Sequence, residues 1–211
     1  VIDASGETGG GTVLVGGDFQ GGNTAVQNAQ RTYVGPDTTI RADALGEGDG
    51  GKVIVWSDDV TRFYGNISAR GGAQSGNGGF AEVSGKEFLV YRGKADLSAP
   101  SGNFGTLLLD PRDITIQASG ADNNQLTANV PTGEVAGQIL FGATTSTDFT
   151  LTAGTVSGSS ANIVLQAQRD ININSPVTLN NDLDIIAQAG HDININAALT
   201  TNGVTAGNGR I

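Results

Sequence analysis

The sequence predicts an all-β protein whose fold is a right-handed parallel β-helix, or β-solenoid, with one or two loops outside the helix. Glycine accounts for 33 of the 211 residues, roughly twice its usual share. Short alternating or β-branched strands follow glycine-rich turns at recurring intervals. No stretch sustains the three-and-four spacing of apolar residues that an amphipathic helix requires. Together these observations favour stacked strands joined by tight turns.

Residues 1–116 are expected to form β-helix coils with glycine-rich turns. Each repeat has an apolar residue and an alanine, then the turn, then a second strand. The pairs are Ile2/Ala4, Ile40/Ala42, Ile67/Ala69 and Leu97/Ala99. The glycines before the second strand are Gly11, Gly51, Gly79 and Gly105, at intervals of 40, 28 and 26 residues. The two shorter intervals suit one coil, and the long one contains a loop excursion at about 16–37.

Residues 161–211 are expected to form coils of a second type, marked by the pentad DININ. Ile163 aligns with Leu183, and Asp170 aligns with Asp192 after a two-residue insertion that contains His191. Isoleucine and asparagine alternate in each pentad, so the isoleucines should face the core and the asparagines the solvent. The asparagines should stack between coils as amide ladders. They are Asn172, Asn174, Asn194 and Asn196.

Residues 117–160 interrupt the repeat. This stretch is polar and contains Pro131 and several glycines, which predicts an insertion with short strands. The strands are expected at 138–141 and 148–152. The two sets of coils then belong to one domain that is divided by the insertion.

The composition excludes several classes of function. The formal net charge of −10 opposes binding to nucleic acid or to an anionic membrane. Without cysteine the chain has neither disulfides nor a catalytic thiol, and no apolar run reaches the ~18 residues of a membrane span. The absence of methionine and of capping segments predicts a processed product or a segment of a longer chain, or ends that join other subunits.

The phrases GGKVIVW, YGNISARGG, GFAEVSGK and GTLLLDP lie within residues 10–116. With them the chain resembles the filamentous-haemagglutinin-type large exoproteins of two-partner secretion (type Vb). Residues 161–205 resemble the downstream repeats of the same proteins. The resemblance implies a right-handed parallel β-helix that is exported through an outer-membrane transporter to the cell surface or beyond. The asparagine–proline motifs of the family's secretion domain are not found, which places this chain after that domain.

Several residues are candidates for metal binding or catalysis. Asp49, in the turn GEGDGG at 46–51, resembles one calcium-binding turn, but such sites need the turn repeated, so an ordinary exposed turn is favoured. Two charged clusters could act on polysaccharide, although a solvated rim with local ion pairs is the simpler interpretation. The clusters are Lys52, Asp58, Asp59 and Arg62, and Asp110, Arg112 and Asp113. His191, the single histidine, cannot build a usual zinc site without cysteine.

No catalytic residue, cofactor or metal ligand is therefore predicted. Trp56, Phe63 and Tyr64 are the possible surface contacts, for a glycan or a protein, with packing in the interior as the favoured alternative.

The first functional hypothesis is a secreted or cell-surface, adhesin-like rod without catalytic activity. One alternative is a filament subunit that stacks end to end with itself. The other is a β-helix that binds or cleaves polysaccharide. The expected partners are the outer-membrane two-partner-secretion transporter, further copies of the chain, and a surface glycan or protein receptor.

Overall fold

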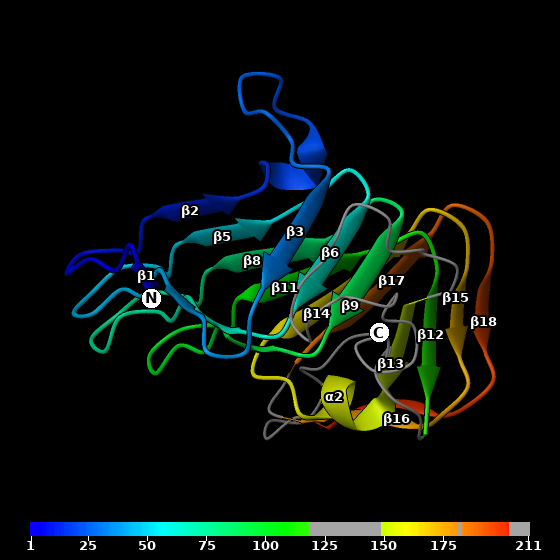
Figure 1. Ribbon diagram of the computed structural model, residues 1–211. Coiled ribbons are helices and arrows are strands. Elements are labelled where there is room, and N and C mark those ends of the chain that lie inside the picture. The colour runs from blue at the N-terminus through cyan, green and yellow to red at the C-terminus, as the bar shows by residue number, and fades with distance from the viewer. Residues whose placement is uncertain (119–148, 181–182, 203–211) are drawn as a thin grey trace.

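The computed structural model describes residues 1–118, 149–180 and 183–202 (Figure 1). Nearly all regular structure in these residues is β-strand. The helical segments are the single 3-10 turn η1 (Phe19–Gly21) and the short helix α2 (Ala153–Ser157). All pairings between the described strands are parallel. The predicted all-β class with parallel strands is confirmed.

The strands form five parallel sheets, which we number I to V. Sheet I has the order β17-β14-β11-β8-β5-β2, and its strands are β2 (Thr12–Val15), β5 (Lys52–Val55), β8 (Phe80–Ser84), β11 (Thr106–Asp110), β14 (Asn162–Ala167) and β17 (Ile185–Ala189). Sheet II consists of β3 (Arg31–Val34), β6 (Val60–Phe63) and β9 (Phe88–Tyr91). Sheet III consists of β1 (Ile2–Asp3), β4 (Thr39–Arg41), β7 (Asn66–Ser68) and β10 (Lys94–Asp96).

The later part of the chain builds the other two sheets. Sheet IV has the order β13-β12-β15-β18, formed by β12 (Ile114–Gln117), β13 (Phe149–Thr152), β15 (Ile171–Ile173) and β18 (Ile193–Ile195). Sheet V pairs β16 (Val177–Asn180) with β19 (Leu199–Asn202). Apart from β12 and β13, which both belong to sheet IV, strands that follow one another in sequence go to different sheets. Sheets I, II and III each take one strand from successive repeats.

The glycine repeat is confirmed by the register of sheet I. The strands that begin one residue after Gly11, Gly51, Gly79 and Gly105 pair at their first residues. The last apolar/alanine pair was placed wrongly, because Ala95 pairs with Ile67, and Leu97 takes the place of Ala69. Gly105 N–H donates to the Leu97 carbonyl as Gly79 N–H donates to that of Ala69. Both placements alternate apolar residues, so the pattern alone could not distinguish a two-residue shift.

The C-terminal register is simpler than predicted. Ile163 pairs with Ile185 rather than Leu183, twenty-two residues on. Ile171 pairs with Ile193, also twenty-two residues on, so there is no insertion between these strands. His191 occupies the position that corresponds to Arg169 in the preceding repeat. The Arg169 carbonyl accepts the His191 N–H at 2.9 Å.

The two loop predictions have different outcomes. The excursion assigned to 16–37 ends earlier, because β3 pairs with β6 within that range, and we call the part outside the sheets loop 16–30. The strand expected at 148–152 is confirmed as β13, which pairs with β12 on the side away from β15. The strand expected at 138–141 lies outside the described residues. Helix α2 was not predicted.

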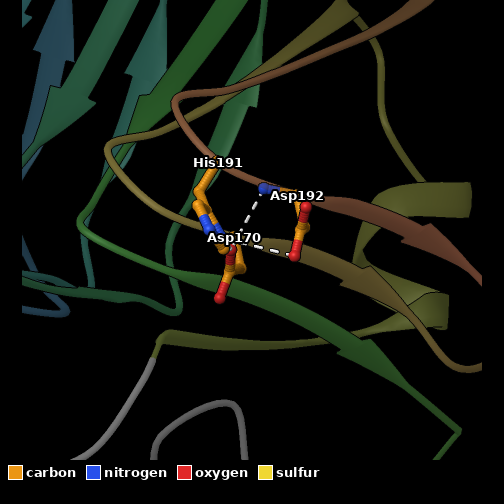
Figure 2. Close-up of side chains that lie close together, drawn as sticks. All are labelled: Asp170, His191 and Asp192. Carbon is orange, nitrogen blue, oxygen red and sulfur yellow. Dashed lines mark hydrogen bonds and ion pairs between the residues drawn. The ribbon is translucent and has the colours of Figure 1, made fainter.

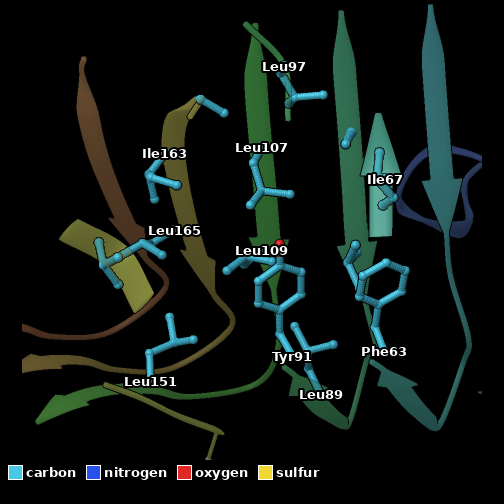
Figure 3. Packing of buried hydrophobic residues seen from close by; sticks show 14 of the residues in the cluster. Phe63, Ile67, Leu89, Tyr91, Leu97, Leu107, Leu109, Leu151, Ile163 and Leu165 are labelled. Carbon is cyan, nitrogen blue, oxygen red and sulfur yellow. The ribbon is translucent and has the colours of Figure 1, made fainter. Parts of the chain in front are cut away.

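One apolar cluster runs through the interior from Val13 to Ile185 (Figure 3). Alternation selects its members, since Ile163 and Leu165 are buried while Val164 between them is partly exposed. Phe63 and Tyr91, paired in register in sheet II, stack with ring centroids 5.6 Å apart. Burial of this cluster is the main stabilising contribution, at roughly 25 cal/mol per Å² of apolar surface.

Candidate functional site

A buried polar site lies on the outer face of sheet I, beneath loop 16–30. Glu82 pairs in register with Ile54 on one side and Leu108 on the other, and all three side chains are buried. Glu82 is 0% exposed, although strand alternation directs it away from the interior cluster. The Gln20 N–H of loop 16–30 donates to both carboxylate oxygens of Glu82, at 3.2 and 3.1 Å.

Gln20 has an unusual backbone conformation. It is the non-glycine residue with a positive φ, +50°, among those the structure describes. Such a conformation carries a cost and persists where surrounding contacts hold it. Its side-chain Nε2 donates to Gln166 Oε1 at 2.8 Å and lies 3.5 Å from Asp110 Oδ2. Gln20 thus joins the loop to three strands of sheet I.

Two further contacts hold the loop against the sheet. Lys52 Nζ lies 3.2 Å from Asp18 Oδ1, and the Phe19 ring meets Phe80 edge-on at 5.8 Å. Hydrogen bonds from Asn23 and from the Phe19 N–H lower the pKa of Asp18 to about 2. Asp18 therefore keeps its negative charge, which pairs with Lys52, down to about pH 2.

In contrast to Asp18, the two carboxyl groups under the loop have pKa values that burial raises. Burial raises the pKa of Glu82 to about 7 and that of Asp110 to about 6, against opposing hydrogen bonds from Gln20. Paired carboxyl groups with raised pKa values are a feature of acid–base sites. Here the loop covers Glu82 completely, so a substrate has no access to it in this arrangement. Glu82 was missed from the sequence, where the available signal was a single glutamate inside the apolar strand FAEVS.

The charged cluster predicted around Asp58 is not assembled. Asp58 Oδ1 accepts from Trp56 Nε1 at 3.1 Å and from Asn28 at 2.9 Å. Asp59 pairs instead with Arg31 at 3.1 Å. The other two members also lie apart from Asp58, with Lys52 bound to Asp18 and Arg62 buried in sheet II. Asp58 lines a polar cavity of about 520 Å³, bounded by Gln20, Gly21, Asn28, Trp56, Lys86, Asp110 and Gln168.

Of the three aromatic residues considered as surface contacts, two are interior. Phe63 is 0% exposed in the main cluster, and Trp56 is 4% exposed. Trp56 lies against loop 16–30, where a side chain on Gly17 or Gly21 would approach the indole to within 2.7 Å. Tyr64 is half-buried, 5.8 Å from the Tyr33 ring. Contact with a glycan or protein through this group can therefore involve only Tyr64.

The second charged cluster belongs to a ladder of aspartates at the corner before sheet IV. Asp113 Oδ1 accepts the N–H of Asp170 at 3.3 Å, and Asp170 Oδ1 accepts that of Asp192 at 3.1 Å. Arg169 binds both oxygens of Asp113, at 2.9 and 2.7 Å, and Arg112 adds a third contact. Burial acts to raise the pKa of Asp113, but these hydrogen bonds prevail and lower it. Asp110, in contrast, lies under loop 16–30.

We expect Asp113→Ala to lower the free energy of unfolding by about 2 kcal/mol at pH 7, because it leaves two arginines and one N–H without their buried acceptor. The matched control is Asp192→Ala, at an exposed rung, with a change within about 0.5 kcal/mol. Since the pKa of Asp113 is lowered on folding, its contribution should be lost as the pH falls below about 4. Urea unfolding of both variants at pH 7 and pH 3 measures this, and equal losses would contradict it.

His191 completes the exposed end of this ladder (Figure 2). Its Nδ1 lies 3.0 Å from Asp170 Oδ1 and 3.2 Å from Asp192 Oδ2, and the Asp170 hydrogen bond, with both negative charges, raises the pKa of His191. In the described part of the chain these three residues form the one group with ligand atoms close enough, within 4.8 Å, to share a metal ion. Their mutual hydrogen bonds account for the geometry, so we assign the group to the corner rather than to a metal.

Asp49 also has a structural partner. Its Oδ1 accepts the Asn77 N–H of the next turn at 2.7 Å, and Asn77 Oδ1 accepts that of Asn103 at 2.9 Å. The predicted amide ladder is present as well, with Asn194 bonded to Asn172 at 3.0 Å and Asn196 to Asn174 at 2.8 Å. Side chains at the corners therefore link one repeat to the next.

No protein-family model matches the chain, and no curated protein matches its sequence. Within residues 1–118, 149–180 and 183–202, no helix has the length and apolar character that a membrane span needs.

Proposed function

We propose that this chain is a segment of a right-handed parallel β-helix that serves as a stiff, non-catalytic rod in a secreted or cell-surface adhesin-like protein. The observation that carries the proposal is the strand order of the sheets. Sheets I, II and III each receive one strand from successive repeats, in parallel register. A chain that returns to each sheet in turn follows the path of a solenoid coil.

The side-chain ladders support a mechanical role. Asp49, Asp113 and Asp170 each accept a backbone N–H of a later repeat, and the DININ asparagines bond to one another. Each repeat is thus fixed to its neighbour by corner hydrogen bonds as well as by the sheets. Stiffness along the stack is the property that a spacer needs to hold binding loops away from a surface.

The proposed setting rests on the resemblance to filamentous-haemagglutinin-type exoproteins. In that setting an outer-membrane two-partner-secretion transporter exports the chain, and a glycan or protein at another cell surface is the eventual contact. The acidic surface, with a net charge of −10, disfavours anionic polymers as partners. Antibodies against this chain should label intact cells of the source organism, whereas labelling only after permeabilisation would contradict export.

Cryo-electron microscopy tests the architecture itself. We expect a single hand of coil and a rod whose axial repeat is about 4.8 Å. A left-handed coil, or sheets that close into separate sandwiches, would contradict the proposed β-helix.

An end-to-end filament is the second candidate, and the edge strand β18 favours it. Ile193 and Ile195 pair with buried isoleucines of β15 but are themselves 44% and 55% exposed. An edge with exposed apolar side chains invites a further parallel strand, which a second copy of the chain could supply. Filaments whose length grows with protein concentration would support this alternative, and rods of one fixed length would exclude it.

A further inference from the structure

A cavity opens where sheet III stops. Its edge strand β10 pairs along its length with β7. On the other side, within the described ranges, only Asp96 meets a partner, Ser160, in an isolated bridge. The segment that precedes Ser160 is α2, which packs against β16 and β13 instead of adding a strand to β10. A cavity of about 690 Å³ lies between β10 and α2.

Small residues make this space. In the register of sheet III, Ala95 occupies the row filled by Ile40 and Ile67 in the two preceding strands. The side chain of Ala95 therefore has three carbon atoms fewer than the isoleucine side chains that fill the interior in the preceding strands. Gly93 lies just before β10, and Gly154 and Gly158 line the opposite side. A row that changes from isoleucine to alanine leaves a void when the surroundings do not collapse.

The inner wall of the cavity is apolar. It is formed by side chains of the main cluster, among them Leu107, Leu109, Leu151, Val156 and Ile163. Tyr91 also lines it, and the Tyr91 hydroxyl points into the interior on the side of Leu109 (Figure 3). Tyr91 is 4% exposed, and its hydroxyl places a polar group on this wall. A polar atom of a ligand can form a hydrogen bond with it.

The outer rim is basic in a protein that is otherwise acidic. Arg41, Arg92 and Lys94 line it together with one carboxylate, Asp96. Asp96 is already engaged by Ser98 at 2.6 Å and by Arg70 at 3.7 Å. Lys94 is exposed on the edge strand. The rim therefore favours an anion, while the depth of the cavity favours hydrocarbon.

We propose that this cavity binds an anionic amphiphile, with an alkyl chain or aryl ring among the leucines and a carboxylate or similar anion at the rim. This binding activity goes beyond the proposed rod function and does not depend on it. The alkyl part replaces the missing side-chain volume at Ala95, and the anion meets the charge of Lys94, whereas Arg41 also pairs with Asp3 at 3.9 Å. We propose a free fatty acid as the ligand. A phospholipid acyl chain has the same chemistry and is tested separately.

The test is calorimetric titration of the whole chain with decanoate, in parallel with decanol and with phosphatidylglycerol vesicles. We expect one saturable decanoate site. Ala95→Ile fills the cavity and should weaken decanoate binding about tenfold or more, with unchanged or raised thermal stability. Lys94→Gln should weaken decanoate about two- to fivefold and leave decanol unchanged, which separates the charge from the hydrocarbon contact. Lys86→Gln, on the rim of the other cavity, is the charge control and should change neither.

The proposal is overturned if decanoate does not bind saturably, or if a folded Ala95→Ile variant binds it as the parent does. If Lys94→Gln weakened the binding of decanoate and decanol equally, the proposed contact between Lys94 and the anionic group of the ligand would be wrong. If the protein bound phosphatidylglycerol vesicles but not decanoate, the ligand would be a membrane phospholipid and not a free fatty acid. Because Lys94→Gln lies on the surface and should fold normally, the test does not depend on the cavity variant alone.

Discussion

Gly79→Ala is expected to destabilise the protein by about 3 kcal/mol. A Cβ at Gly79 would lie 2.1 Å from the Gly51 carbonyl oxygen of the preceding repeat. The same column continues on the other side, since a Cβ at Gly105 would lie 2.0 Å from the Gly79 carbonyl oxygen. The obstructing atoms are backbone, so relief requires two repeats to move apart and weakens the pairing of sheet I.

Gly154→Ala is the matched control. Nothing lies closer than 4.0 Å to the position of its Cβ, and the residue is inside α2, where alanine is favoured over glycine by about 0.5–1 kcal/mol. Urea unfolding of the two variants should give shifts of opposite sign. A loss of less than about 1 kcal/mol for Gly79→Ala would show that the repeats do not stack as closely as the register implies.

Acid should stabilise the protein relative to mild alkali, and Glu82→Gln should remove most of that difference. The pKa of Glu82 is raised from an unfolded value near 4.5 to about 7 by burial under loop 16–30. The folded state therefore holds a proton that the unfolded state has released. The contribution is fully present below about pH 4.5 and is lost as the pH rises through 7, with an upper limit of about 3 kcal/mol.

Asp110 acts in the same direction over a lower range, because its pKa rises to about 6. The positive charge of Lys52, which is bound to Asp18, slightly moderates the rise in the pKa of Glu82. In Glu82→Gln the amide oxygen can still accept the Gln20 N–H, so the loop should stay in place while the titration disappears.

Unfolding free energies of the wild type and Glu82→Gln, measured from pH 5 to pH 8, check this. Glu87→Gln makes the same chemical change at an exposed position five residues on and should leave the wild-type slope intact. If the wild type gained stability with rising pH, or if Glu82→Gln kept the full slope, the buried carboxyl would not be the titrating group. Proteolysis within loop 16–30 should increase above pH 7 in the wild type alone.

The sequence carried enough information for the strands but not for their exact neighbours. The column Gly11, Gly51, Gly79 and Gly105 was correctly predicted, because a glycine before a β-branched strand is a local signal. The places of Leu97 and Leu183 were wrong by two residues. Strand alternation has a period of two, so a shift of two residues keeps the apolar face and leaves no trace in the pattern.

The candidate sites depended on contacts that sequence spacing does not contain. Gln20 and Glu82 are 62 residues apart and meet because a loop folds back over sheet I. The Ala95 cavity exists because α2 follows β13 where a strand could have been added to β10, and the short α2 was not predicted. By contrast, the asparagine ladder was predicted, because identical pentads place identical side chains in register.

The corner ladders have a direction. At Asp49, Asp113 and Asp170 the acceptor belongs to the earlier repeat and the backbone donor to the later one. A stack that ends after any repeat therefore presents carboxylates, which water solvates easily, whereas one that lacks its first repeats presents amides without acceptors. Shortening from the C-terminal side should thus cost less than shortening from the N-terminal side. For a polypeptide that emerges N-terminus first, each finished turn is a template with acceptors in place for the next.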